Sequence, residues 1–232
     1  IDLAEEPIQQ VKKYEKSTQL YFFGLVWLVF ADPEKHKSLI DKVILAITSS
    51  SKPKLERMHR DMIWDDHALS ERVSVYSSIL ASQLRHKLSV ETLKCIQDDI
   101  VRCDNILIEF IQSSKWSNNN HRIFHICGHL SFCHFNSYQE QFEVYFGILE
   151  STITALFQIE TGLSVEQSVS YYSFDLILLN KVSEFLNVVS IYPTWFDYST
   201  LFERNKLAMS FLSFPNGDLP ASGDTPLGFQ LK

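Results

Sequence analysis

The sequence predicts an all-α protein, and three observations support that fold class. Only seven glycines and seven prolines occur in 232 residues, so long elements can run without interruption, which suits helices. Apolar residues recur at helical spacing, for example at Leu93, Ile96, Ile100 and Cys103. No strand-like alternation and no Asn-Gly hairpin turn occurs before residue 214. A hydrophobic content of 45% allows a substantial core.

The first part of the chain predicts a helical hairpin. A helix from Ser17 to about Phe30 carries apolar residues at helical spacing, and the sequence Ala31-Asp32-Pro33-Glu34 is expected to end it and to cap the next helix. That second helix should end near Ser49. The longest apolar run, Leu20 to Ala31, has 12 residues, whereas a membrane-spanning helix needs about 20.

Helix-start signals continue through the rest of the chain. Asp65 or Asp66 is a plausible N-cap, and Ser89 begins a helix that should reach about Ile111. About eight helices in antiparallel pairs are expected, an outline that fits either a helical solenoid or a toroid of helical hairpins. The remaining helix-length segments are 121–134, 138–158, 168–189 and 196–212.

Charge and cysteine content exclude several classes of protein. A net charge of −7 and a pI near 5.6 argue against nucleic-acid binding, which requires a basic face. The four cysteines have no C-x-x-C spacing and are few for the chain length, so free and mostly buried thiols are expected. They are Cys95, Cys103, Cys127 and Cys133.

Three groups of residues could carry chemistry. The first is Trp64, His67 and Arg72, near a predicted helix N-terminus, where backbone N–H groups and an arginine favour an anionic ligand. The commoner interpretation of such residues is an N-cap and a solvated arginine.

The second group is Asn120-His121, which continues as His121-x-x-x-His125-x-x-x-His129. Spacing of four residues puts the three imidazoles on one helical face, as in some metal sites. No carboxylate is interleaved as in His-Glu-x-x-His, so the sequence does not predict a metal.

The third group is Glu166-x-Ser168-x-x-Tyr171-Tyr172. A tyrosine pair on a helix usually belongs to the core, with its hydroxyls at the surface. Only the other motifs in the chain favour a functional role for these tyrosines.

Taken in order, these motifs resemble the helical domain of heparinase II/III-type polysaccharide lyases. The resemblance covers roughly residues 17 to 226. It rests on Trp-x-x-His-x-x-x-x-Arg at 64–72, Asn-His at 120–121, Glu-x-Ser-x-x-Tyr at 166–171 and Gly-x-Leu-Pro-x-x-Gly-Asp at 217–224.

The resemblance implies an incomplete (α/α) toroid of antiparallel helical hairpins over residues 1–213. Residues 214–232 would be a turn-rich exit toward a β-sandwich domain that this sequence does not contain, so the chain is expected to be a fragment or a protein that has lost that part. In several members of the family the β-sandwich supplies a further catalytic histidine. This chain is therefore expected to bind substrate and to turn over slowly.

The resemblance also implies a function: cleavage of a uronic-acid-containing anionic polysaccharide by β-elimination, without a cofactor or a metal. Asn120 and His121 would neutralise the uronate carboxylate, and Tyr171, or its neighbour Tyr172, would be the base and acid. The partner would be the polysaccharide, with no nucleic acid and no membrane, in the periplasm or outside the cell. The expected substrate-binding residues are His67, Arg72, Trp64, Glu166 and Tyr172.

Two other interpretations stay open. A toroid without activity could bind carbohydrate or act as a scaffold, and a helical solenoid could bind protein partners along an apolar concave surface. Aromatic and polar residues near helix ends, such as Trp64 and Asn120, suit stacking on sugars and contacts with uronates better than they suit a protein partner.

Overall fold

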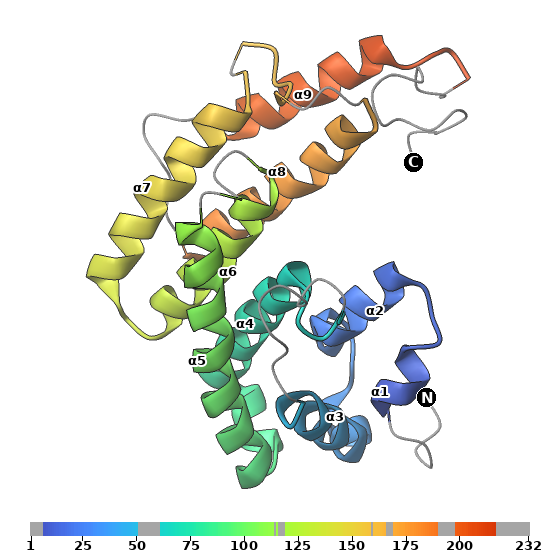
Figure 1. Ribbon diagram of the computed structural model, residues 1–232, viewed down its shortest axis with the longest axis vertical. Helices are drawn as coiled ribbons and strands as arrows, with labels where there is room; N and C mark the ends of the chain where they lie inside the picture. Colours follow the sequence, from blue (N-terminus) through green and yellow to red (C-terminus); the bar gives the residue numbers. More distant parts are fainter. Residues whose placement is uncertain are drawn as a thin grey trace. The chain divides into compact units, whose positions relative to one another are not determined.

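The computed structural model describes residues 7–50, 61–113, 115, 119–158, 160–165, 169–189 and 198–216. Helices make up 79% of it, with no strand among these residues, so the predicted all-α class is confirmed. A single isolated β-bridge joins Phe157 and Ser164. The helices, shown in Figure 1, are α1 Pro7–Val11, α2 Lys16–Phe23, η1 Val26–Val29, α3 Pro33–Thr48, α4 Asp66–Ala81, η3 Gln83–Lys87, α5 Val90–Gln112, α6 His121–Phe135, α7 Gln139–Leu156, α8 Val169–Val189 and α9 Tyr198–Leu212.

The chain forms two compact units. The first unit comprises residues 1–114 and 124–146, and the second comprises residues 115–123 and 147–232. The divisions therefore fall inside α6, after Ile123, and inside α7, after Phe146. Because α6 and α7 are each continuous, residues that are neighbours along either helix keep ordinary helical spacing across the division.

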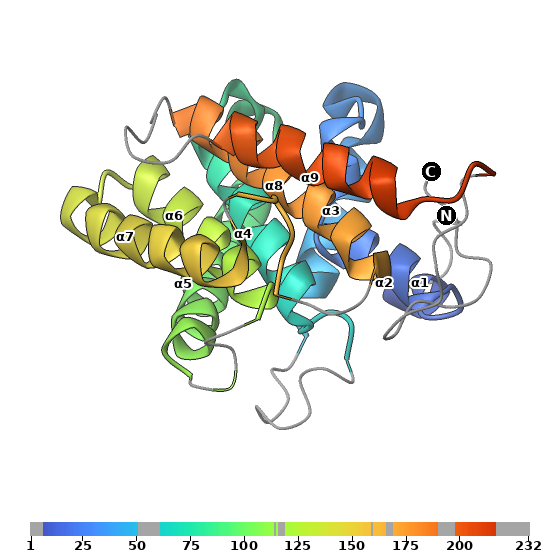
Figure 2. The ribbon, with the colours of Figure 1, turned by 90° about the horizontal axis from the view of Figure 1, so that it is seen from above.

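The first unit is built around the pairing of α4 with α5. The amino-terminal helices surround this pair, with α3 against α5, α2 against α4 and α1 against α3, as Figures 1 and 2 show. Apolar residues of α3, α4 and α5 have no exposed area, among them Ile44, Leu69 and Leu107. Burial of this shared apolar surface stabilises the unit.

The predicted helix from Ser17 to Phe30 is wrong, because the chain breaks after Phe23. A Cβ added to Gly24 would lie 2.9 Å from the Cβ of Glu71 on α4, so only glycine permits this close approach. Leu25 then adopts a positive φ of 61°, and the chain continues as the short helix η1. The break leaves Phe30 80% exposed, although helical spacing had placed it with the buried residues.

Two predicted helix starts are confirmed. The side chain of Asp65 accepts a hydrogen bond from the backbone N–H of His67 at 3.1 Å. Ser89 does the same for the N–H of Thr92 at 3.1 Å. Each cap satisfies a backbone donor that has no partner within the helix.

In the second unit, α8 and α9 lie side by side, which is visible in Figures 1 and 2. The turn before residue 166 is fixed against α9 because the Asn205 amide donates to the Gly162 carbonyl oxygen at 2.7 Å. Gly162 has a positive φ of 75°, and a Cβ there would lie 2.3 Å from the backbone nitrogen of Asn205. Glycine is therefore required at this position.

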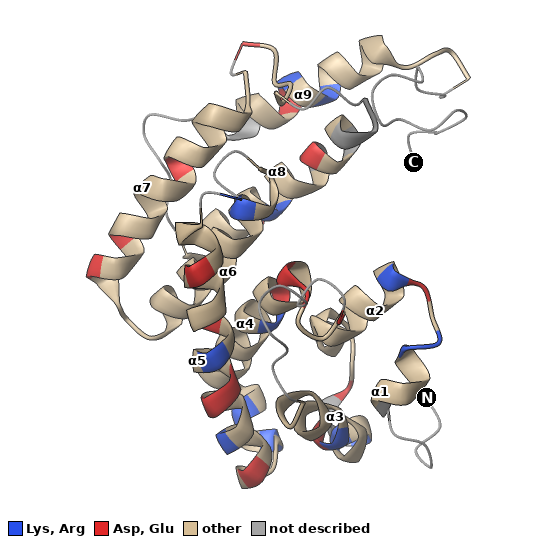
Figure 3. Cartoon of the chain, viewed as in Figure 1, with Lys and Arg blue, Asp and Glu red and all other residues tan. Residues whose placement is uncertain are grey.

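Acidic and basic side chains are mixed along the described helices. Figure 3 shows both acidic and basic positions on α5 and α9, in keeping with a net charge of −7. None of the described helices is long and apolar enough to cross a membrane. Of the predicted exit segment, residues 215 and 216 form a turn, and the Gly-x-Leu-Pro-x-x-Gly-Asp motif at 217–224 lies outside the described residues.

Candidate functional site

Trp64 lies inside the first unit and has no exposed area. The guanidinium carbons of Arg72 and Arg102 lie 5.6 Å and 4.6 Å from the centroid of its indole ring. A desolvated cation–π contact such as that of Arg72 contributes about 2 kcal/mol, whereas that of the partly exposed Arg102 contributes less. Trp64 thus packs two arginines together instead of presenting a stacking surface for a sugar.

Arg72 is also completely buried. One terminal nitrogen donates to the carbonyl oxygens of Ile63 at 2.9 Å and Phe23 at 3.3 Å, and the other donates to Cys103 Sγ at 3.4 Å. Its Nε lies 3.5 Å from Asp99 Oδ2. Burial disfavours the charged guanidinium, but Cys103 and Asp99 outweigh this effect and raise the pKa of Arg72.

Asp99 extends this network. It pairs with Arg102, whose guanidinium also donates to the carbonyl oxygen of Thr48 at 3.0 Å, and it accepts from the Tyr76 hydroxyl at 3.3 Å. The network therefore joins α3, α4, α5 and the chain segment before α4. Trp64 and Arg72 have no exposed area and are held in this network by their contacts with other parts of the protein, so we correct their predicted substrate-binding role to a structural one.

His67 is partly exposed, in the first turn of α4. Its imidazole stacks on the ring of Phe124, with centroids 4.5 Å apart and planes 25° apart. Of the three residues in the first predicted motif, His67 alone keeps surface with which to contact a ligand. Its predicted substrate-binding role is compatible with this position.

Buried polar contacts fix α6 on α4 and α5. The Ser70 hydroxyl donates to the carbonyl oxygen of Phe124, and His125 Nε2 lies 2.7 Å from Asp66 Oδ2. A Cβ on Gly128 would lie 2.8 Å from Leu107 on α5 and 2.9 Å from the Ser70 hydroxyl on α4. Both helices therefore approach α6 closely at this glycine. These contacts define the position and rotation of α6 within the first unit.

A third polar contact to α6 involves His129. Its Nδ1 lies 2.7 Å from Asp104 Oδ1, and its Nε2 lies 3.4 Å from Cys133 Sγ. Burial raises the pKa of Asp104, although His129 opposes this, and burial raises the pKa of the Cys133 thiol to about 12. The thiol is therefore protonated near neutral pH and can donate to Nε2, while Nδ1–H donates to the carboxylate.

Asn120 and His121 lie where α6 begins. The side chain of Asn119 caps the helix by accepting from the His121 N–H at 2.8 Å, and the carbonyl oxygen of Asn120 accepts from the Ile123 N–H at 3.0 Å. Asn120 is only 5% exposed.

One set of side chains could hold a metal. Asp66, His121 and His125 offer ligand atoms that all lie within 4.8 Å of one another, and the two histidines are one turn apart on α6. Ligand atoms on one tetrahedral zinc are about 3.3 Å apart, given zinc–ligand distances of about 2.0–2.1 Å. The 2.7 Å between His125 and Asp66 is shorter and matches a hydrogen bond, so we retain the expectation that no metal is bound.

The tyrosine motif is described only in part. Glu166 lies outside the described residues, and Tyr171 lies on α8, but its side chain is likewise outside the description. Tyr172 is partly exposed. Burial, and then the nearby Asp175, raise the pKa of Tyr172, which opposes a role as a tyrosinate base.

Sequence reasoning missed the contacts of Asp66 and Asp104. Asp66 was expected only as an alternative N-cap, and Asp104 was not singled out, yet these carboxylates from α4 and α5 pair with His125 and His129. The four-residue histidine spacing on α6 was the available signal. It could not identify partners that lie 59 and 25 residues away in the sequence.

Comparisons with family models, with curated proteins and with solved structures each found no match to this chain.

Proposed function

We propose that this chain is the helical part of a polysaccharide lyase that cleaves a uronic-acid-containing polymer by β-elimination. The proposal includes an incomplete toroid of helical hairpins as the arrangement of the helices and a β-sandwich as the partner domain. It rests on the order of the sequence motifs and on the chemistry of the residues that remain accessible. The observation that carries it is the nearly buried side chain of Asn120 beside His121, at the start of α6.

Elimination requires loss of the proton on C5 of the uronate. This proton becomes acidic only when the charge of the adjacent carboxylate is neutralised. The Asn120 amide has N–H donors that can hydrogen-bond to that carboxylate and stabilise the enolate-like transition state. Because Asn120 is nearly buried, this hydrogen bond would form in a largely desolvated environment, where it is stronger than in water.

The reaction then needs a base and an acid. The base takes the C5 proton, and the released electron pair forms the C4=C5 double bond as the C4–O4 bond breaks. The acid protonates the departing O4. We assign the base to Tyr171, or to His121 for one uronate epimer, and the acid to the phenol of Tyr171.

Tyr172 is the weaker candidate for the base. A phenol titrates near 10, so a tyrosinate base needs a lowered pKa, whereas burial and Asp175 raise that of Tyr172. We therefore propose that Tyr172 contacts substrate as a neutral phenol. His67 and Glu166 complete the proposed substrate contacts, while Trp64 and Arg72 support the fold.

Ultraviolet absorbance of the unsaturated product tests this proposal. The folded chain would be incubated with heparan sulfate, hyaluronan, chondroitin and alginate, alone and in a version extended with a β-sandwich. A rise in absorbance on one polymer would support the lyase and identify the substrate class. Binding of a polymer without any such rise in either version would favour the non-catalytic carbohydrate-binding alternative.

A further inference from the structure

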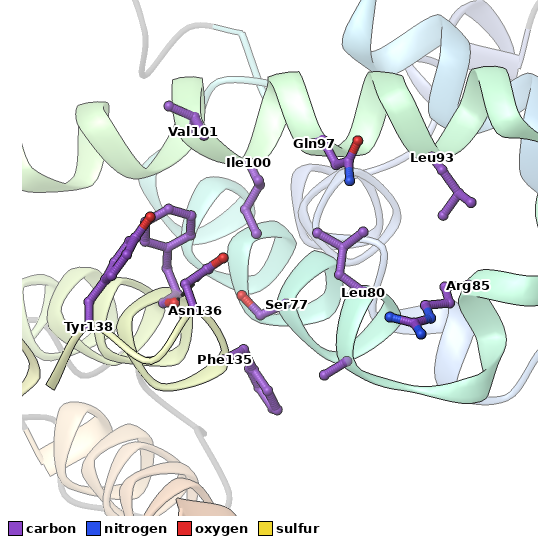
Figure 4. Close-up of a pocket in the computed structure, with 12 residues that line it drawn as sticks. Ser77, Leu80, Arg85, Leu93, Gln97, Ile100, Val101, Phe135, Asn136 and Tyr138 are labelled. Carbon is purple, nitrogen blue, oxygen red and sulfur yellow. Dashed lines mark hydrogen bonds between the residues drawn. The ribbon is translucent and has the colours of Figure 1, made fainter.

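A groove lined by polar and apolar side chains lies wholly within the first unit, and none of the residues proposed for the lyase reaction lines it. It has a volume of about 470 Å³ and is formed by the end of α4, η3, the first half of α5 and the end of α6. Figure 4 shows the side chains that line it. Six of them matter here: Ser77, Arg85, Gln97, Phe132, Asn136 and Tyr138.

Ser77 supplies an unsatisfied hydroxyl to this groove. The residue is only 1% exposed, and its Oγ has no hydrogen-bond partner within the described residues. In Figure 4 the hydroxyl lies between Leu80 and Asn136, among the lining side chains. A buried hydroxyl without a partner is unfavourable, so a ligand that hydrogen-bonds to Ser77 removes that penalty.

Arg85 supplies a positive charge. It is the only charged side chain among the described residues that line the groove, and it is exposed. Its Nε donates to His86 Nε2 at 3.2 Å, and no carboxylate pairs with it within the described part of the chain. Its terminal N–H groups are therefore free to bind a carboxylate or sulfate, which a guanidinium can hold through two hydrogen bonds.

The rest of the lining combines aromatic rings with amides. The rings of Phe132 and Tyr138 are 5.8 Å apart in an edge-to-face arrangement. The Asn136 amide donates to the Phe132 carbonyl oxygen at 2.8 Å, which leaves its side-chain oxygen as an acceptor, and Gln97 adds a second, exposed amide. Binding sites for small polar molecules typically pair apolar surface with a few such placed polar groups.

From these residues we infer that the groove binds one acidic sugar unit, separately from the proposed catalytic residues. Arg85 binds the acid group, Ser77, Gln97 and Asn136 hydrogen-bond to sugar hydroxyls, and the aromatic rings pack on the apolar face of the pyranose. The choice of a sugar rests on the proposed function, whereas the preference for an acid rests on Arg85. In this role the groove holds the polymer and takes no part in bond cleavage.

Titration of the folded chain with sodium glucuronate, followed by NMR, tests the inference. Saturable shifts of the side-chain amide signals of Gln97 and Asn136 are expected, and equal concentrations of glucose or inorganic sulfate should produce much weaker shifts. Arg85→Gln should weaken glucuronate binding by at least about tenfold, the usual cost of losing a charge-assisted hydrogen bond. Lys94→Gln removes the same charge from an exposed residue outside the groove lining and should not change binding.

Ser77→Ala provides a second, independent variant. Because the hydroxyl has no partner within the described residues, its loss should weaken glucuronate binding by about threefold to tenfold without lowering the unfolding midpoint. Equal binding of glucose and glucuronate would overturn the inference. So would equal effects of Arg85→Gln and Lys94→Gln on binding, or amide shifts with inorganic sulfate as large as those with glucuronate. Glucuronate binding without elimination would uphold the groove and count against the lyase, so the two proposals can fail separately.

Discussion

The starts of α4 and α6 look alike in sequence and differ in what their side chains are available to do. An Asx side chain caps each helix, Asp65 for α4 and Asn119 for α6. Near the start of α4, Arg72 uses its terminal N–H groups on protein acceptors. At the start of α6, Asn120 is nearly buried, and the helix cap comes from its neighbour Asn119. Burial is common to both helix starts, so burial alone does not identify a structural residue, whereas the hydrogen bonds of Arg72 to other parts of the protein do.

The largest effect should come from Arg72→Met. Removing the guanidinium leaves the buried carboxylate of Asp99 with one cation fewer, and breaking a buried ion pair costs about 3–5 kcal/mol of unfolding free energy. Denaturant unfolding measures this cost. Lys35→Met, at a side chain that is 78% exposed, should stay within about 0.5 kcal/mol of the unchanged chain. A cost below about 1 kcal/mol for Arg72→Met would show that the network is not structural.

The next largest effect should be the difference in elimination rate between Tyr171→Phe and Tyr172→Phe. Tyr171→Phe should lower the rate of elimination by about 10²–10⁴-fold, the usual contribution of a general acid or base. Tyr172→Phe should retain most of the rate, because the raised pKa of Tyr172 argues against a tyrosinate there. Initial rates of product absorbance, with polymer binding as the control for folding, decide the assignment. The reverse ranking would move the base to Tyr172.

Two helical glycines provide a smaller and matched test of how α6 is positioned. Gly128→Ala should destabilise the chain by about 1–3 kcal/mol, because overpacking forces α6 away from α4. Gly147→Ala on α7, where an added Cβ meets nothing within 4 Å, should stabilise it by up to about 1 kcal/mol through helix propensity. Thermal unfolding of both variants measures the contrast, and equal shifts would argue against close packing at Gly128.

The helices were largely predictable because their signals are local. Asp65 and Ser89 cap the helices that the sequence assigned to them, and α6 begins at His121 as expected. The break after Phe23 was not predictable from periodicity. It depends on the approach of Glu71 from a distant helix and on the left-handed backbone of Leu25, neither of which leaves a pattern in the apolar spacing.

The sequence could predict which residues belong to the candidate site, but not which of them are structural and which could contact a ligand. Sequence motifs selected Trp64, Arg72 and Asn120 alike, and only the contacts of Trp64 and Arg72 with other parts of the protein show that these two are structural. The partner of His125 could not be foreseen, because Asp66 comes from α4. Long-range pairs of this kind depend on how helices pack, which residue spacing within one helix does not encode.

The smallest expected effect concerns metal. Treatment with a chelator, and addition of zinc, should leave the unfolding midpoint and the activity unchanged, because Asp66 and His125 already hydrogen-bond at 2.7 Å. Thermal unfolding with and without zinc measures this directly. A stabilisation that grows with zinc concentration and disappears in His121→Ala would instead establish a metal centre at Asp66, His121 and His125.

The most direct test of the central claim compares Asn120→Ala with Asn119→Ala in the elimination assay. Asn120→Ala should abolish product formation and lower the unfolding midpoint less than Asn119→Ala does, because the cap hydrogen bond is made by Asn119. Asn119→Ala should lose about 0.5–2 kcal/mol of stability with the helix cap and retain its rate well below its midpoint. Full activity of Asn120→Ala, or no product from the folded, unchanged chain and its extended version on any of the four polymers, would contradict the proposal.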